Sequence, residues 1–175
     1  TAVGFQALAA NTTASNNTAV GQNALVANTT GALNTAVGSR AGDAITTGGS
    51  NVAIGSEAMT TLTTGSQNIA VGESSLALCT TASYNTGVGH LSLYSTTTGA
   101  SNSAFGHLAL QDMTTGSNNT GVGTYAGTDI TTGSQNTCVG AYSGEHGGNR
   151  LTTGSGNTLV GYGAIPSAVG GTAQI

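Results

Sequence analysis

The sequence predicts an all-β chain folded as a parallel β-solenoid of about ten coils, with 17 residues in each coil. The main observation is the pentapeptide N-T-A-V-G, whose near-copies end in glycines that are 17 residues apart eight times and then 21 apart. A period kept over most of a chain indicates a repeat architecture. Units this short and rich in β-branched residues exclude helical repeats, which need about 30 or more residues each. The closing glycines are Gly4, Gly21, Gly38, Gly55, Gly72, Gly89, Gly106, Gly123, Gly140 and Gly161.

The copies share a pattern that is clear once the Asn of each pentapeptide is counted as repeat position 1. Position 1 is Asn in all nine complete copies, position 5 is always Gly, and position 4 is Val or Ile except at Phe105. Position 8 is Ala or Ser, position 9 is mostly Leu, Met or Ile with three Gly, and positions 13 and 14 are Thr–Thr. The residues that represent this structural repeat include Asn17, Val20, Gly21, Asn34, Val37, Gly38, Asn85, Val88 and Gly89.

Each position predicts a local structure. Seventeen residues allow two short strands and two turns in each coil, and coils stacked about 4.8 Å apart form a rod about 45–50 Å long. Gly at positions 5 and 15 suits turns that need a positive φ. Asn at position 1 suits a turn as well, and its amide can hydrogen-bond to the Asn of the next coil.

The charges are few and lie on one side of the predicted coil. The net charge is −4 with only two cations, which argues against a nucleic-acid surface, and no run approaches the length of a membrane helix. The six acids and Arg40 lie at positions 6, 7, 10 or 11, whereas positions 1–5 carry no charge. We therefore expect both faces of the pentapeptide strand to be covered, one by the coil interior and one by identical chains in a homotrimer. Small residues at position 3, such as Ala19 and Gly87, are expected to let those chains approach closely.

Residues that could carry chemistry are scarce. His90 and His107 share position 6 in adjacent coils, so their rings are expected about 5 Å apart. They form either an ion site or two solvent-facing polar residues, and the second interpretation is favoured because no Cys accompanies them in phase. Cys79 and Cys138 lie nearly four coils apart, beyond disulfide reach, and are expected to fill apolar space. We expect no catalytic residue, cofactor or metal site, and a function other than an enzyme's.

One segment interrupts the repeat. Between Gly140 and Gly161 the spacing of 21 adds four residues within Glu145–Arg150, among the charged positions. Solenoids place insertions as loops on an exposed face, which is often the binding face. The segment is either a passive bulge or part of a receptor-facing surface. That predicted surface consists of Tyr125, Tyr142, Glu145, His146, Asn149 and Arg150.

The pentapeptide, with its trailing small and apolar residues, resembles the head repeats of trimeric autotransporter adhesins. The chain is more similar to the repeat regions of bacteriophage tail fibres, especially those of phages that infect cyanobacteria. In these, runs of N-T-A-V-G lead into a C-terminal intramolecular chaperone, and the segment Gly161–Gly171 resembles the junction before it. The resemblance implies a left-handed solenoid, intertwined or packed as a homotrimer. It also implies a repeat domain at residues 1–165 and an exit segment at 166–175 that leads to a further domain.

The function that this resemblance implies is a structural and attachment segment of a virion tail fibre that contacts a host cell-surface receptor, a glycan being one candidate. One alternative is the head of a bacterial adhesin, on the outer surface of a bacterium. A second is an ice-binding solenoid, suggested by the Thr columns at positions 13 and 14. Consecutive Thr residues point to opposite faces of a strand, which argues against this second alternative.

Overall fold

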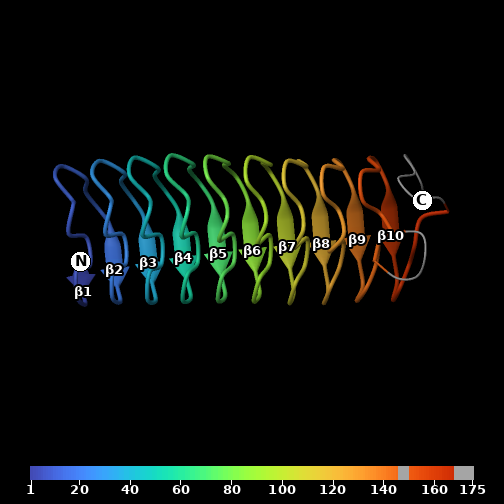
Figure 1. The fold of residues 1–175 in the computed structure, drawn as a ribbon, viewed down its shortest axis with the longest axis horizontal. Coiled ribbons are helices and arrows are strands. Elements are labelled where there is room, and N and C mark those ends of the chain that lie inside the picture. The colour runs from blue at the N-terminus through green and yellow to red at the C-terminus, as the bar shows by residue number, and fades with distance from the viewer. Residues whose placement is uncertain (146–149, 168–175) are drawn as a thin grey trace.

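Ten short strands, one in each coil, form a single parallel sheet in the computed structural model, which describes residues 1–145 and 150–167 (Figure 1). The sheet follows chain order from β1 to β10, and the described residues contain no helix. The predicted all-β parallel solenoid with a 17-residue repeat is thus confirmed. The strands are β1 (Ala2–Val3), β2 (Thr18–Val20), β3 (Thr35–Val37), β4 (Val52–Ile54), β5 (Ile69–Val71), β6 (Thr86–Val88), β7 (Ser103–Phe105), β8 (Thr120–Val122), β9 (Thr137–Val139) and β10 (Thr158–Val160).

The strands occupy repeat positions 2–4 and pair in strict register. Ala19 of β2 lies opposite Ala36 of β3, one full repeat later. Thr137 of β9 lies opposite Thr158 of β10, so the four added residues leave the sheet register intact. β-Branched residues at positions 2 and 4 favour this extended backbone.

Each coil has one strand, so the prediction of two strands per coil is wrong. After the strand, positions 7 and 9 take left-handed φ values, such as 57° at Asn23 and 50° at Leu25. Left-handed residues interrupt an extended backbone, and this part of the coil is built of turns and bends. The coils remain joined there through the backbone, for example from Leu25 N to Ala41 O at 3.0 Å.

The core is a thin apolar column inside the coils, built from positions 3, 8, 9 and 12. Ala19 at position 3 is fully buried, and its neighbours at positions 2 and 4 face outward because side chains alternate along a strand. The prediction that position 3 lets separate chains approach is therefore wrong. Small residues there make room inside the coil. A Cβ on Gly87 would lie 2.6 Å from Oγ of Ser75, which is hydrogen-bonded to Ser92.

The side chains at positions 9 and 12 are complementary in size in most coils: where one is large, the other is small. In four coils a Leu at position 9 stands with a smaller residue at position 12 (Asn11, Asn28, Cys79 or Thr96), whereas the three coils with Gly at position 9 have Ile45, Ile130 or Leu151 there. A Cβ on Gly42 would lie 3.0 Å from Cδ1 of Ile45, so the larger residue fills the space from the other wall. Two coils carry large residues at both positions, Met59 with Leu62 and Leu110 with Met113.

A ladder of buried Asn side chains at position 1 joins every coil to the next, as predicted. The backbone N–H of Asn34 donates to Oδ1 of Asn17 at 2.8 Å, and Nδ2 of Asn34 donates to Gly48 O at 2.8 Å across the same coil. Nδ2 of Asn51 in turn donates to Oδ1 of Asn34 at 3.1 Å. The nine members are at most 6% exposed, so each amide satisfies groups that water does not reach.

Glycine predominates at positions 5 and 15 for different reasons. At position 5 the φ values run from 121° to 141°, as predicted, and a Cβ on Gly38 would lie 2.5 Å from Gly55 O. At position 15 the prediction of a positive φ is wrong. The space for a side chain there is restricted, because a Cβ on Gly31 would lie 2.1 Å from Gly48 O. Two coils carry Ala at this position, Ala14 and the buried Ala82, so a Cβ is accommodated there when the neighbouring backbone adjusts.

Candidate functional site

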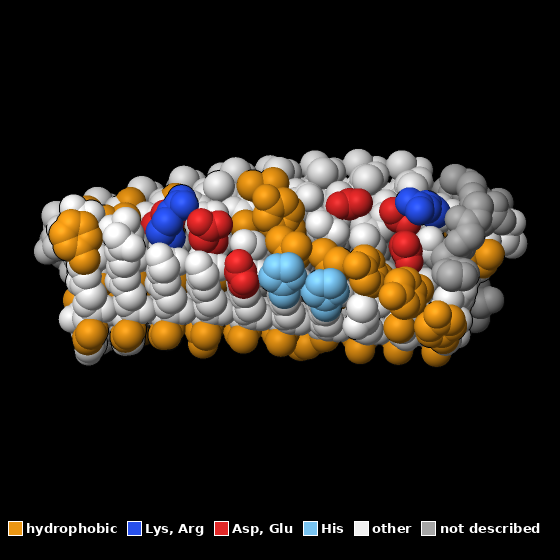
Figure 2. Space-filling view, turned by 60° about the horizontal axis from the view of Figure 1, so that its bottom comes forward, with side chains coloured by type: hydrophobic (Ala, Val, Ile, Leu, Met, Phe, Trp, Pro, Cys, Tyr) orange, Lys and Arg blue, Asp and Glu red, His pale blue; other side chains and the backbone are white. Residues whose placement is uncertain are grey.

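The outer face of the sheet carries a column of apolar side chains that runs the length of the rod. The column comes from position 4, and Figure 2 shows a row of apolar side chains along the lower edge of the molecule. Val71, Val88 and Val139 in this column are partly exposed. Alternation along the strand places Ile69, from position 2, on the same face, where it is 40% exposed. The exposed fractions of the other members are Val3 56%, Val20 37%, Val37 37%, Ile54 38%, Phe105 44%, Val122 38% and Val160 69%.

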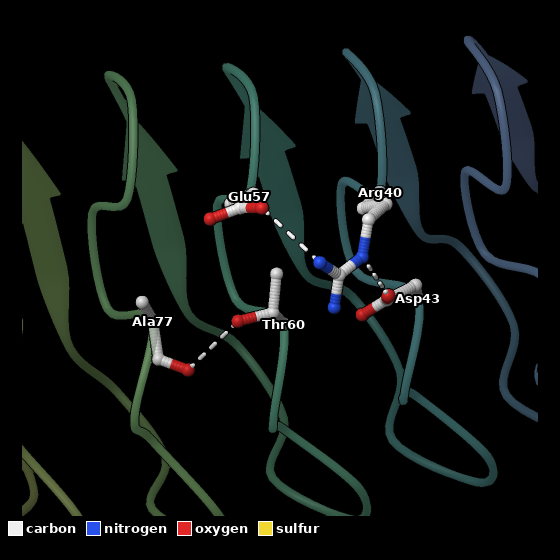
Figure 3. A network of polar contacts seen from close by, with 5 residues as sticks. All are labelled: Arg40, Asp43, Glu57, Thr60 and Ala77. Atoms are coloured by element: carbon white, nitrogen blue, oxygen red, sulfur yellow. Dashed lines mark hydrogen bonds and ion pairs between the residues drawn. The ribbon is translucent and has the colours of Figure 1, made fainter.

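The charged positions form a separate side of the rod. Nε of Arg40 lies 3.0 Å from Oδ2 of Asp43 in its own coil, and Nη1 lies 3.1 Å from Oε1 of Glu57 in the next coil (Figure 3). These contacts raise the pKa of Arg40, mainly through the hydrogen bond to Asp43. Beside them, Thr60 donates to Ala77 O at 3.2 Å. Because Arg40 and Glu57 are about half exposed, solvent screens this pairing, and it contributes little to stability.

A row of five rings follows one line across the last five coils. His90 and His107 are stacked with ring centroids 5.3 Å apart, which confirms the predicted spacing, and Figure 2 shows them side by side in pale blue. His107 meets Tyr125 edge-on at 5.5 Å, and Tyr125 stacks on Tyr142 at 5.1 Å. Tyr142 meets Tyr162 edge-on at 5.8 Å. We call these five residues the ring row; it joins the predicted Tyr125 and Tyr142 to His90, His107 and Tyr162.

The base of the insertion lies beside the ring row. The backbone N–H of Glu145 donates to Tyr142 O at 3.2 Å, and Leu151 N donates to Gly144 O at 2.9 Å, which closes the coil below the insertion. Nη1 of Arg150 lies 3.0 Å from Oδ1 of Asp129 in the preceding coil. Glu145 and Arg150 therefore lie on the charged side, as predicted. His146 and Asn149 lie outside the described residues.

Burial controls the titration of Asp129. Its side chain is 13% exposed, and the loss of hydration raises the pKa of its carboxyl above the usual 3.8. Arg150 lowers that pKa, whereas the nearby carboxyls of Glu145 and Asp112 raise it. This corner of the rod thus holds three acids against one cation, with burial as the largest influence on Asp129.

The described residues hold no group of three or more His, Cys, Asp or Glu side chains that could bind a metal ion. The rings of His90 and His107 are parallel within 10°, so their nitrogens do not converge on one point as ligands of a single ion would. Cys79 and Cys138 are buried free thiols, and burial raises their pKa values to about 11 and about 12. Their role as apolar filler agrees with this. Among the described residues the surface is not hollowed into a pocket.

The Thr columns differ from the pattern expected of a strand. Positions 13 and 14 lie in a bend, and the position 13 hydroxyls donate to the next coil, as Thr29 Oγ1 does to Thr46 O at 3.2 Å. The position 14 side chains, such as Thr30, are exposed. One exposed column therefore remains instead of the two neighbouring columns on which an ice-binding surface would depend.

Two surfaces of the rod thus stand out: the uncharged outer face of the sheet and the neighbouring side with the ring row and the insertion base (Figure 2). No helix in the described part of the chain has the length and hydrophobicity needed to cross a membrane. Comparisons with protein-family models, with curated proteins and with solved structures found no match.

Proposed function

We propose that this chain is a non-enzymatic structural and attachment segment of a trimeric viral tail fibre that takes part in adhesion to the host cell. The observation that carries the proposal is the apolar column on the outer face of the sheet. A contiguous apolar surface of several hundred Å² that follows the whole length of the rod indicates a contact with another molecule. A partner that covers it over its whole length must itself be a rod with the same repeat, and a second copy of this chain meets that condition.

The distribution of charge supports identical partners. All six acids lie away from the sheet face, so copies that pack through this face keep their like charges at the outer perimeter. Ten strands about 4.8 Å apart and about 10 Å long give a flat face on the order of 500 Å². Specific interfaces bury about 800 Å² per partner, so neighbouring uncharged positions must add to the contact. Leu33 and Tyr84 at position 17, which are 58% and 61% exposed, offer such area.

The face itself requires at least one partner, and the number three comes from the resemblance to tail fibres and adhesin heads. In a trimer of this kind each chain pairs its own strands, and three rods pack side by side without intertwining. The charged side, with the ring row and the insertion base, then faces outward. That side is where contact with a host receptor would take place.

The first test is the mass in solution. Light scattering should give three times the 16.8 kDa of one chain, at micromolar concentration. A monodisperse monomer would refute the proposed fibre. The viral assignment has a test of its own, because the residues that follow Ile175 in the full gene should encode a chaperone of the tail-fibre type. A membrane anchor there would instead identify the head of a bacterial surface adhesin, which shares this geometry.

A further inference from the structure

The apolar column cannot by itself fix how far along the rod neighbouring chains are placed. Position 4 holds Val or Ile in eight of the nine complete copies, and neighbouring strands pair in the same register from coil to coil. A chain shifted by one coil along its neighbour would again place Val opposite Val. Only the contacts of the end coil would be lost. A uniform repeat therefore permits several registers that differ little in energy. Only a residue that breaks the repeat on this face can distinguish them.

Among the strand residues of the outer face, Phe105 in β7 departs most from the repeat. Its strand neighbours are Val88 in β6 and Val122 in β8, so one aromatic ring stands between two smaller β-branched side chains. Phe105 is 44% exposed, more than the 37–38% of Val20, Val37, Ile54 and Val122. At position 2 the departures are smaller, because Val52 and Ile69 replace Thr with side chains of similar shape.

We propose that Phe105 specifies the axial register of the homotrimer, so that the three rings meet at one level. This inference rests on the trimer of the proposed function. In the matched register the three rings face one another and the interface can adapt to one wide level. A shift by one coil moves each ring to the level of Val88 or Val122 in its neighbour, where it is too large, and leaves a gap at the level it vacates. Overpacking of this kind disfavours the shifted register by roughly tenfold or more.

The test measures register by cross-linking. Chains with Val122→Cys are mixed with chains with Val139→Cys before assembly, and a short bismaleimide links thiols that lie close together. Links between two residues 122, or between two residues 139, report the matched register. Links from 122 to 139 report a shift of one coil. Cys79 and Cys138 are buried and do not compete.

With Phe105 present, matched links should exceed shifted links by roughly tenfold or more. In the same chains with Phe105→Val the two kinds should differ by no more than about threefold, because the column is then uniform. Val already occupies this position in other coils, so the variant should fold, and circular dichroism checks that it does. Adding Val71→Phe to Phe105→Val moves the ring two coils away and should restore matched links. Equal link ratios with and without Phe105 would overturn the inference, and a monomeric wild type would instead overturn the proposed trimer.

Discussion

Replacement of Asn85 by Ala tests how much the Asn ladder contributes to stability. Asn85 is fully buried; its Nδ2 donates to Gly99 O at 2.9 Å, and its Oδ1 accepts from the backbone N–H of Asn102 at 3.0 Å. Ala leaves both backbone groups buried without a partner. Each unsatisfied buried group costs about 1–3 kcal/mol, so the free energy of unfolding should fall by about 2–6 kcal/mol. That is a large part of the 5–15 kcal/mol typical of a folded domain.

Urea unfolding followed by circular dichroism measures this loss, with Thr98→Ala as the matched control. Thr98 lies at exposed position 14 in the same coil, so its removal should change the free energy of unfolding by less than about 0.5 kcal/mol. Solenoids can unfold in segments, so hydrogen exchange at the backbone N–H of Asn102 should report the local loss as well. A decrease below about 1 kcal/mol for Asn85→Ala would show that water or a rearranged coil replaces the ladder.

Asn85→Asp adds a pH dependence to the same test. A carboxylate oxygen in place of Nδ2 would face Gly99 O at about the 2.9 Å of the present hydrogen bond, acceptor against acceptor. Burial and that contact should raise the pKa of the new carboxyl above its usual value near 3.9. At a pH below about 3.9 the carboxyl is protonated and can donate to Gly99 O, so the variant keeps its stability there. That stability should be lost as pH rises through the raised pKa, so the variant should be weakest near neutrality. A deficit that does not change with pH would contradict this account.

Three further predictions concern the surfaces. Val88→Asp should prevent assembly of the proposed trimer, seen as a monomer by light scattering, because three unpaired carboxylates would meet at one level of it. Thr124→Asp, at an exposed position outside the apolar column, is the control. Deletion of His146–Asn149 restores the 17-residue spacing and should leave the unfolding midpoint unchanged. If the deletion variant does not fold, the insertion is part of the core and the prediction is wrong. Burial raises the pKa of Asp129, so wild type should lose stability relative to Asp129→Asn as pH rises past 3.8, and parallel melting curves would contradict that.

The period, the strand positions and the Asn ladder could be predicted because each depends on one residue type recurring every 17 residues. The single strand per coil could not be predicted. Leu25 with a φ of 50° and Tyr125 with a φ of 58° adopt a conformation that costs an L-residue about 1–2 kcal/mol. Propensity alone argues against placing them there. Hydrogen bonds to the adjacent coils, such as Tyr125 N to His107 O at 2.9 Å, hold this backbone, and they exist only once the coils are stacked.

The ring row was missed for a related reason. His107 lies at position 6 and Tyr125 at position 7, and consecutive residues of an extended strand point to opposite sides. The left-handed φ values of 58° at Tyr125 and 59° at Tyr142 break that alternation. The position 7 rings therefore continue the line of position 6 rings, with centroids 5.5 Å apart at the junction. The residues of the candidate surface could be read from the sequence, but their contiguity depended on a backbone angle that the residue types do not suggest.

The difference between the two sides of the rod follows from how each coil is held. A ladder residue such as Asn85 donates to Gly99 O in its own coil and accepts from both the backbone N–H and Nδ2 of Asn102 in the coil after it, so an Asn at the same position gives it the full set of bonds. A change at one rung leaves buried groups unpaired in two coils, which keeps the inner positions uniform. Position 6 does not belong to the buried Asn ladder, and its residue type varies: it is Gln22 in one coil, His90 in another and Tyr162 in a third. The repeat therefore separates stability from surface chemistry, and a rod of constant core can present a different side chain every 4.8 Å or so along its charged side. For this reason we expect the contacts that distinguish one receptor from another to lie at positions 6, 7, 10 and 11.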